Sequence, residues 1–263
     1  MAQSVSIGTA WSETAAFVAR EKRLLAPLVL ALIVVPTTLA QLIQPANPLA
    51  AANGVAAWMV AALLALLIGL VGQMAISRLA MGADRSLGAT IAFALRRLPA
   101  TLGAFILFFL ALSLLLIPLI VLLSLASGAA PGQQPGGGVD ALLLLIIIAS
   151  VPRILLAPAL AMREPLGPLG LARAAWVATR GHYWRLLSFF LLFFVASLVF
   201  ALAASSVIGS IATLALGPPE PLSVSRLVIA LAGGVVQGVV ATLYAAMIGR
   251  LLVQLPSGPI NGM

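Results

Sequence analysis

The stretch that decides the predicted fold is R-E-P-L-G-P-L-G-L-A-R-A-A-W-V-A-T-R-G-H-Y-W-R-L-L, Arg163 to Leu187. It is basic, carries aromatic residues at its end, and leads into a long apolar run from Ser188. Weaker versions begin at Ser6 (S-I-G-T-A-W) and at Ser86 (S-L-G-A-T-I), and each also precedes an apolar run. A pattern that recurs about every 80 residues predicts tandem copies of one unit, each an amphipathic surface helix followed by a membrane hairpin.

The composition predicts that lipid surrounds most of the chain. Of 263 residues, 63% are hydrophobic and 8% are charged, and the mean hydropathy is +1.20. A soluble domain carries about 25% charged residues, so this chain has too few charges to cover a soluble globule. We expect an all-α integral membrane protein, one polytopic domain over residues 1–263 with repeat units of about 6–85, 86–167 and 168–255.

The apolar runs predict six transmembrane helices, each near or above the ~20 residues that cross a bilayer. Their expected ranges are about 24–42, 55–80, 101–125, 140–162, 186–214 and 226–252. Amphipathic surface helices are expected before the first, third and fifth spans, over 6–23, 81–99 and 163–185. Pro36 predicts a kink in the first span unless neighbouring groups bond the carbonyl that it frees.

The basic residues predict the orientation, because cytoplasmic loops of membrane proteins carry an excess of Lys and Arg. One side holds Arg20, Lys22, Arg23, Arg78, Arg85, Arg96, Arg97, Arg163, Arg173, Arg180, Arg185 and Arg250. The other side holds Arg226 alone. The asymmetry predicts cytoplasmic N- and C-termini, and it accounts for the net charge of +8 without nucleic acid as a partner.

The same basic residues predict contact with anionic lipid, because basic amphipathic helices bind the negatively charged inner leaflet. The residues expected at lipid headgroups are Arg20, Lys22, Arg23, Arg96, Arg97, Arg173, Arg180 and Arg185. A membrane-protein partner, or a second copy of the chain, is an alternative occupant of this face.

Three polar residues are expected inside spans: Gln73, Arg153 and Gln237. Arg153 follows Pro152 and precedes Pro158, and an ionisable group within a span usually faces the protein interior or a wet cavity. Its side chain either lines a pathway, with the two glutamines as partners, or extends toward the inner headgroups. Hydrogen bonds between helices are the simpler role for the glutamines.

A stripe of small residues spaced four apart predicts a close helix contact in the last span. It consists of Gly234, Gly238, Thr242 and Ala246. Packing within the chain and dimerisation are both compatible with such a stripe.

Catalytic and metal sites find little support in the sequence. The chain has no Cys and one His, His182, which excludes disulfides and argues against a transition-metal site. The six acidic residues are dispersed, although Asp84 and Glu164 have comparable positions in their units. We therefore predict no enzyme activity and no cofactor. A lipid-modifying enzyme would require a cleft that gathers Asp84, Glu164 and His182.

The repeated pattern and the stretch A-R-A-A-W-V-A-T-R-G-H-Y-W-R-L-L, Ala172 to Leu187, resemble a family of bacterial inner-membrane proteins. This is the glycerophosphoryl diester phosphodiesterase membrane-domain family, to which uncharacterised YciC-like proteins are similar. The resemblance covers almost the whole chain. It implies an accessory role in the lipid or envelope of the bacterial inner membrane, and it supplies no catalytic motif.

Two functions are compatible with these observations. The favoured hypothesis is a non-enzymatic inner-membrane protein that binds anionic lipid, or a protein partner, through its cytoplasmic helices. The alternative is a small transporter or channel with Arg153 in its pathway, although three tandem units lack the paired inverted halves common in transporters.

Overall fold

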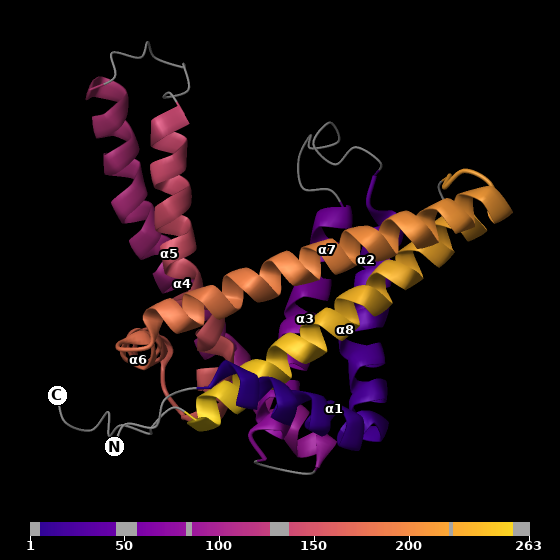
Figure 1. The fold of residues 1–263 in the computed structure, drawn as a ribbon, viewed down its shortest axis with the longest axis horizontal. Coiled ribbons are helices and arrows are strands. Elements are labelled where there is room, and N and C mark those ends of the chain that lie inside the picture. The colour runs from indigo at the N-terminus through magenta and orange to yellow at the C-terminus, as the bar shows by residue number, and fades with distance from the viewer. Residues whose placement is uncertain (1–5, 46–56, 83–85, 127–136, 221–222, 255–263) are drawn as a thin grey trace. The chain divides into compact units, whose positions relative to one another are not determined.

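The computed structural model describes residues 6–45, 57–82, 86–126, 137–220 and 223–254, and all of its regular elements in these ranges are helices (Figure 1). They are α1 (Ile7–Val29), η1 (Leu30–Val34), α2 (Val35–Ile43), α3 (Ala57–Ala80), α4 (Leu87–Ala126), α5 (Gly137–Arg163), α6 (Pro168–Thr179), α7 (Tyr183–Leu216) and α8 (Val224–Gln254). The prediction of an all-α protein is confirmed for these residues.

Six helical stretches in the described residues are long and apolar enough to cross a membrane, as predicted. They are Ile7–Ile43, Ala57–Ala80, Leu87–Leu123, Leu144–Arg163, Tyr183–Leu216 and Val224–Gln254. Large apolar side chains stay exposed along them, among them Leu114, Leu122 and Leu214. Exposed apolar surface of this extent requires a lipid environment. The chain is therefore a multi-pass membrane protein.

The first surface segment and the first span are joined in one helical stretch, Ile7–Ile43, instead of forming two elements. Glu21 leaves helical geometry at φ −97° and ψ 15°, close to the predicted boundary at Arg23. Ahead of Pro36, the helix widens into the π-helical turn η1, whose hydrogen bonds join residues five apart. The irregularity predicted at Pro36 is this turn, which places the proline in the first turn of α2, where a missing N–H is tolerated.

The second surface segment and the third span also form one element. Helix α4 runs through both Pro99 and Pro118 over 40 residues, so the break expected near Pro99 is absent from its helical assignment. A proline removes one backbone hydrogen bond of the helix. The neighbouring hydrogen bonds maintain the helix on either side of it. The third surface segment is a separate helix, α6, which ends before Gly181, where a φ of 81° favours glycine.

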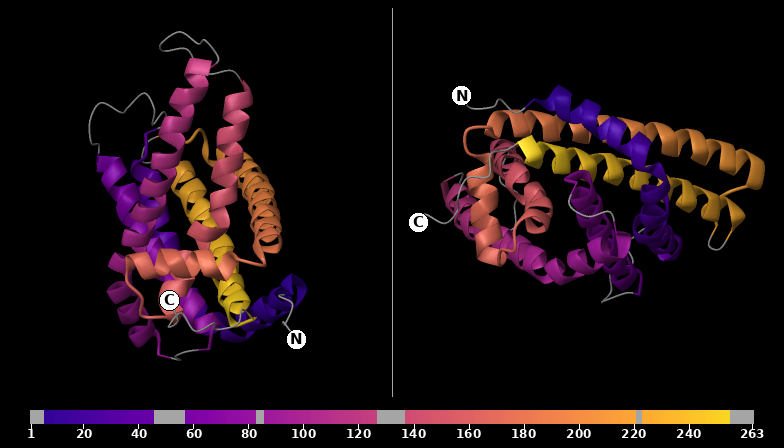
Figure 2. Two further views of the ribbon diagram at one scale, coloured as in Figure 1. Left: turned by 90° about the vertical axis from the view of Figure 1, so that its left-hand side faces the viewer. Right: turned by 90° about the horizontal axis from the view of Figure 1, so that it is seen from below.

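The chain divides into two compact units. The first comprises residues 1–98 and 192–257, and in its described part α8 packs against α3, α1 and the η1–α2 segment (Figure 1, Figure 2). Its buried core joins Phe17 and Leu25 of α1, Ile33 of η1, Ile76 of α3 and Ala245 of α8. Segments from the two ends of the sequence therefore share one core.

The second unit comprises residues 99–191 and 258–263, of which 99–126 and 137–191 are described. Helix α6 packs against α5, and Leu156, Leu171 and Leu186 are fully or almost fully buried. The side chain of Pro168 would lie 2.7 Å from a Cβ at Gly103, so α6 begins directly against α4.

Candidate functional site

Arg153, the intramembrane residue singled out from the sequence, lies in an aromatic cluster of the second unit. Its guanidinium carbon is 3.9 Å from the ring centre of Trp176 on α6 and 5.2 Å from that of Tyr183 at the start of α7. Its Nη1 donates a hydrogen bond of 3.1 Å to the carbonyl of Ala149. The Tyr183 hydroxyl donates to the same carbonyl at 2.9 Å.

The contacts of Arg153 join three helices around one charge. Trp176 and Tyr183 present ring faces, which attract a cation, and the shared carbonyl of Ala149 adds a charge-assisted hydrogen bond. Its Nε is buried without a hydrogen-bond partner in the described part of the chain, while the residue as a whole is partly buried. This geometry fixes α6 and the start of α7 on α5.

The sequence did not indicate these partners. From the sequence, Gln73 and Gln237 were considered as partners of Arg153, and no contact was assigned to Trp176 or Tyr183. The two glutamines belong to the first unit, where they line a cleft, whereas the contacts of Arg153 lie within the second. The sequence signal that could have indicated these partners is the presence of Trp176 and Tyr183 in the basic stretch that follows the span of Arg153.

Three further arginines lie over aromatic rings in the first unit. The guanidinium of Arg78, on α3, lies 3.7 Å from the ring centre of Phe93 on α4, and that of Arg97 lies 5.3 Å from it. The guanidinium of Arg250, on α8, lies 5.4 Å from the ring centre of Phe17 on α1.

The three stacked aromatic residues occupy related sequences. Phe17 lies in T-A-A-F-V-A-R (Thr14 to Arg20), Phe93 in T-I-A-F-A-L-R (Thr90 to Arg96), and Trp176 in R-A-A-W-V-A-T-R (Arg173 to Arg180). In the first two segments, the threonine three residues before the ring is fully buried and bonds the carbonyl four residues earlier. Each ring therefore lies against an arginine of another helix, from α8, α3 and α5 respectively.

The residues predicted at lipid headgroups are largely exposed. Arg20, Lys22, Arg23, Arg96, Arg173, Arg180 and Arg185 are exposed, and Arg97 is partly buried beside Phe93. Arg20 pairs with Glu21 at 3.0 Å, which partly neutralises its charge. Trp11 in the first segment and Trp176 and Trp184 in the third are also exposed, with Trp184 the most exposed at 76%.

The small-residue stripe of α8 lies in the core of the first unit. A Cβ at Gly234 would meet Thr38 Oγ1 and the carbonyl oxygen of Val34, and one at Gly238 would lie 2.9 Å from Val29 and Val34 side-chain atoms. Thr242 and Ala246 are buried on the same helix. The stripe therefore brings α8 close to α1, η1 and α2 within one chain.

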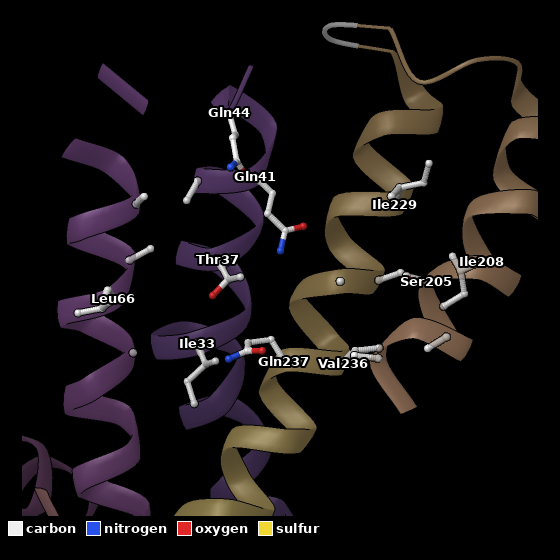
Figure 3. Close-up of a pocket in the computed structure, with 18 of the residues that line it drawn as sticks. Ile33, Thr37, Gln41, Gln44, Leu66, Ser205, Ile208, Ile229, Val236 and Gln237 are labelled. Atoms are coloured by element: carbon white, nitrogen blue, oxygen red, sulfur yellow. The ribbon is translucent and has the colours of Figure 1, made fainter. Parts of the chain in front are cut away.

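A cleft of about 680 Å³ opens in the first unit between α2, α3, α7 and α8 (Figure 3). It is lined by polar side chains from several helices, namely Thr37, Gln41, Gln44, Trp58, Gln73, Ser205 and Gln237. At its α2 end, Arg226 donates to the carbonyl of Gln41 at 3.3 Å and to that of Gln44. Gln73 and Gln237 were predicted as polar residues within spans, while Gln41, Gln44 and Trp58 were missed as site residues.

The described residues contain no group of three His, Asp or Glu side chains that could hold a metal ion. Glu164 and His182 are partly buried, and the backbone N–H of His182 donates to the carbonyl of Thr179 at 3.3 Å. Asp84 and Arg85 lie outside the described residues, and with them the cleft of Asp84, Glu164 and His182 that a lipid-modifying enzyme would require.

In comparisons with known proteins, no protein-family model, curated protein or solved structure matches the chain. The resemblance to the membrane-domain family therefore stays a prediction based on the residues quoted for it.

Proposed function

We propose that the protein is a non-enzymatic component of a bacterial cytoplasmic membrane that binds anionic lipid headgroups through its basic surface segments. The observation that carries this proposal is the side-chain arrangement of α6 and the start of α7. Arg173, Arg180 and Arg185 are exposed together with Trp176 and Trp184. Cations beside exposed tryptophans suit the headgroup region of a bilayer, where phosphates meet the edge of the hydrocarbon.

The other two basic segments support the same proposal. Lys22 and Arg23 are exposed on α1, which also exposes Trp11, and Arg96 is exposed on α4, which also exposes Leu95. A juxtamembrane cation contributes about 1 kcal/mol of attraction to an anionic leaflet. Placing these segments on the cytoplasmic side follows from the positive-inside distribution, and it gives cytoplasmic termini.

We further propose that the chain consists of three tandem units, each a surface helix and a membrane hairpin. The arginine–aromatic contacts support this organisation. Arg78 of the first predicted unit stacks on Phe93 of the second, Arg153 of the second stacks on Trp176 of the third, and Arg250 of the third stacks on Phe17 of the first. A repeated contact that passes from each unit to the next is the relationship expected of duplicated units.

The contacts of Arg153 favour a role in joining helices over a role in a transport pathway. Its guanidinium is engaged by two aromatic rings and a carbonyl, and a transported anion would have to displace them. The role that we assign to Arg153 is to hold α6, and therefore its lipid-binding residues, against the membrane spans.

The lipid-binding proposal is tested by changing Arg173 and Arg180 together to Gln, with the pair changed to Lys as the charge-retaining control. The purified proteins are analysed for co-purifying lipid by mass spectrometry. We expect the Gln pair to retain anionic lipid about thirtyfold less well, because two attractive charges of about 1 kcal/mol each are lost, and the Lys pair to resemble the unmodified protein. Equal retention of anionic lipid in all three would contradict the proposal.

A further inference from the structure

The cleft of the first unit has a chemistry that the binding of anionic headgroups at the surface does not use. Amide side chains enter it from α2, α3 and α8, and none of the described residues that line it is charged. In Figure 3, Gln41 points from α2 toward α8, and Gln237 points from α8 toward the η1–α2 segment. A Cβ at Gly233 would lie 2.9 Å from Gln41 Oε1, so the Gln41 amide reaches the backbone of α8.

The indole of Trp58 adds an unused hydrogen-bond donor to this cleft. Trp58 lines it from the start of α3, and its Nε1 is buried without a hydrogen-bond partner in the described part of the chain. A buried donor without an acceptor costs free energy, and buried Trp nitrogens usually find a partner. A ligand oxygen in the cleft would supply one after a small rotation of the indole, because the nitrogen is shielded from solvent in the position described.

The rest of the cleft wall is apolar and belongs to membrane-spanning helices. Leu198, Leu202 and Ile208 line it from α7, and Ile229 and Val236 line it from α8. Leu198 and Leu202 also belong to the large exposed apolar side chains of α7. An apolar wall with a few converging polar groups, and a volume within ~300–1,000 Å³, is the usual form of a small-molecule site.

The geometry points to a binding site in this cleft for an uncharged lipid that bears hydroxyl groups, of the diacylglycerol kind. A hydroxyl both donates and accepts, so it can bond the oxygens and the nitrogens of the amide side chains in the cleft. A phosphate or carboxylate would enter without a countercharge among the lining residues, which is unfavourable in a membrane. Arg226, at the α2 end of the cleft, is already engaged by the carbonyls of Gln41 and Gln44. A plain hydrocarbon would leave the amides unsatisfied, and a water-soluble polyol would leave the apolar wall uncovered.

Photocrosslinking in phosphatidylcholine nanodiscs tests this site with the full-length protein. The probe is a diacylglycerol that carries a diazirine on the acyl chain close to the glycerol, and labelled peptides are mapped by mass spectrometry. One variant combines Gln41→Leu with Gln237→Leu, and a second, Ala232→Leu, fills the cleft from α8. The matched control is Thr213→Val, which also removes a polar group from a span but lies on α7 outside the cleft lining.

We expect labelling of the helices that line the cleft, reduced about tenfold by either cleft variant through lost hydrogen bonds or lost space, and unchanged in the control. Leucine favours membrane insertion, and a native circular-dichroism spectrum and a monodisperse elution profile identify folded variants. Unlabelled diacylglycerol should compete with the probe, whereas glycerol should not.

Three results would overturn the inference. Equal labelling of the folded cleft variants and the control would show that the probe does not bind in the cleft. Competition by glycerol as strong as that by diacylglycerol would assign the cleft to a soluble polyol. Labelling of the same peptides by an equivalent phosphatidylglycerol probe, at equal strength, would show that the site does not select an uncharged group.

Discussion

The guanidinium carbon of Arg153 lies 3.9 Å from the ring centre of Trp176, which joins a charge within a membrane span to the helix that carries exposed basic residues. Trp176 is half exposed, so the ring stacks on Arg153 while part of it remains accessible from outside. This contact links membrane packing to the surface that we propose for lipid binding, and it is the natural first target for mutation.

A double-mutant cycle measures the Arg153–Trp176 contact directly. We expect Arg153→Met and Trp176→Leu each to lower the free energy of unfolding, with a coupling energy of about 1 kcal/mol, since cation–π pairs are strongest where the cation is desolvated. Reversible unfolding in mixed micelles provides the measurement. The same cycle on Arg185 and Trp176 is the control. A coupling energy for Arg153–Trp176 no larger than that control would contradict the role given to Arg153.

Close contact between α8 and α3 predicts that Gly249 tolerates no larger residue. A Cβ there would lie 2.7 Å from the carbonyl oxygen of Ser77 and 2.9 Å from the Cβ of Ala80, and backbone atoms cannot move aside cheaply. Gly249→Val should destabilise the protein by about 3 kcal/mol. Gly88→Val is the matched control, because no atom lies within 4 Å of a Cβ at Gly88. Similar melting temperatures for the two variants would be inconsistent with this packing.

The hydroxyl of Ser77 donates a 3.0 Å hydrogen bond to the carbonyl of Ala245, and Ser77 is buried between α3 and α8. We predict that Ser77→Ala lowers the free energy of unfolding by about 0.6–1.5 kcal/mol, the range for interhelical hydrogen bonds in membranes. Ser205→Ala should have a smaller effect, because Ser205 is exposed and bonds a carbonyl of its own helix. The two variants are compared in the same mixed-micelle unfolding assay, and an equal loss in both would argue against the Ser77 contact.

Arg226 donates to the carbonyls of Gln41 and Gln44, where α2 ends. Because the last carbonyls of a helix lack partners and carry partial negative charge, Arg226→Gln should loosen the last turn of α2. We expect amide hydrogen exchange to rise about fivefold in that turn, corresponding to the loss of about 1 kcal/mol. Arg226→Lys should restore most of the protection. Unchanged exchange in Arg226→Gln would exclude this capping role.

The spans were predictable because each is a long apolar run in the sequence, bounded by basic residues or by loops that contain Gly and Pro. The last span was expected over 226–252 and is observed as Val224–Gln254. The continuous passage of α4 through Pro99 was not predictable from residue types, since a proline ends some helices and is accommodated in others. An irregularity at Pro36 was predictable, but its form, a π-helical turn in which Ile33 and Val34 are buried, was not.

The site residues were predictable as polar groups in unusual places, but their partners were not. Gln73 and Gln237 stand out in apolar runs, yet the cleft depends on how α2, α3, α7 and α8 pack, which no pattern along one helix encodes. The partners of Arg153 lie on the next two helices of the chain. In the sequence, the position of Trp176 is explained equally well by anchoring at the membrane interface as by contact with Arg153.

The central claim is that the basic segments face the cytoplasm and that the loop between α7 and α8 faces the opposite side of the membrane. Because the chain contains no Cys, single cysteines can be introduced and treated in intact cells with a membrane-impermeant maleimide. We predict that Glu220→Cys is labelled in intact cells, and that Pro165→Cys, before α6, is labelled only after lysis. Labelling of Pro165→Cys in intact cells, with Glu220→Cys protected until lysis, would contradict the account.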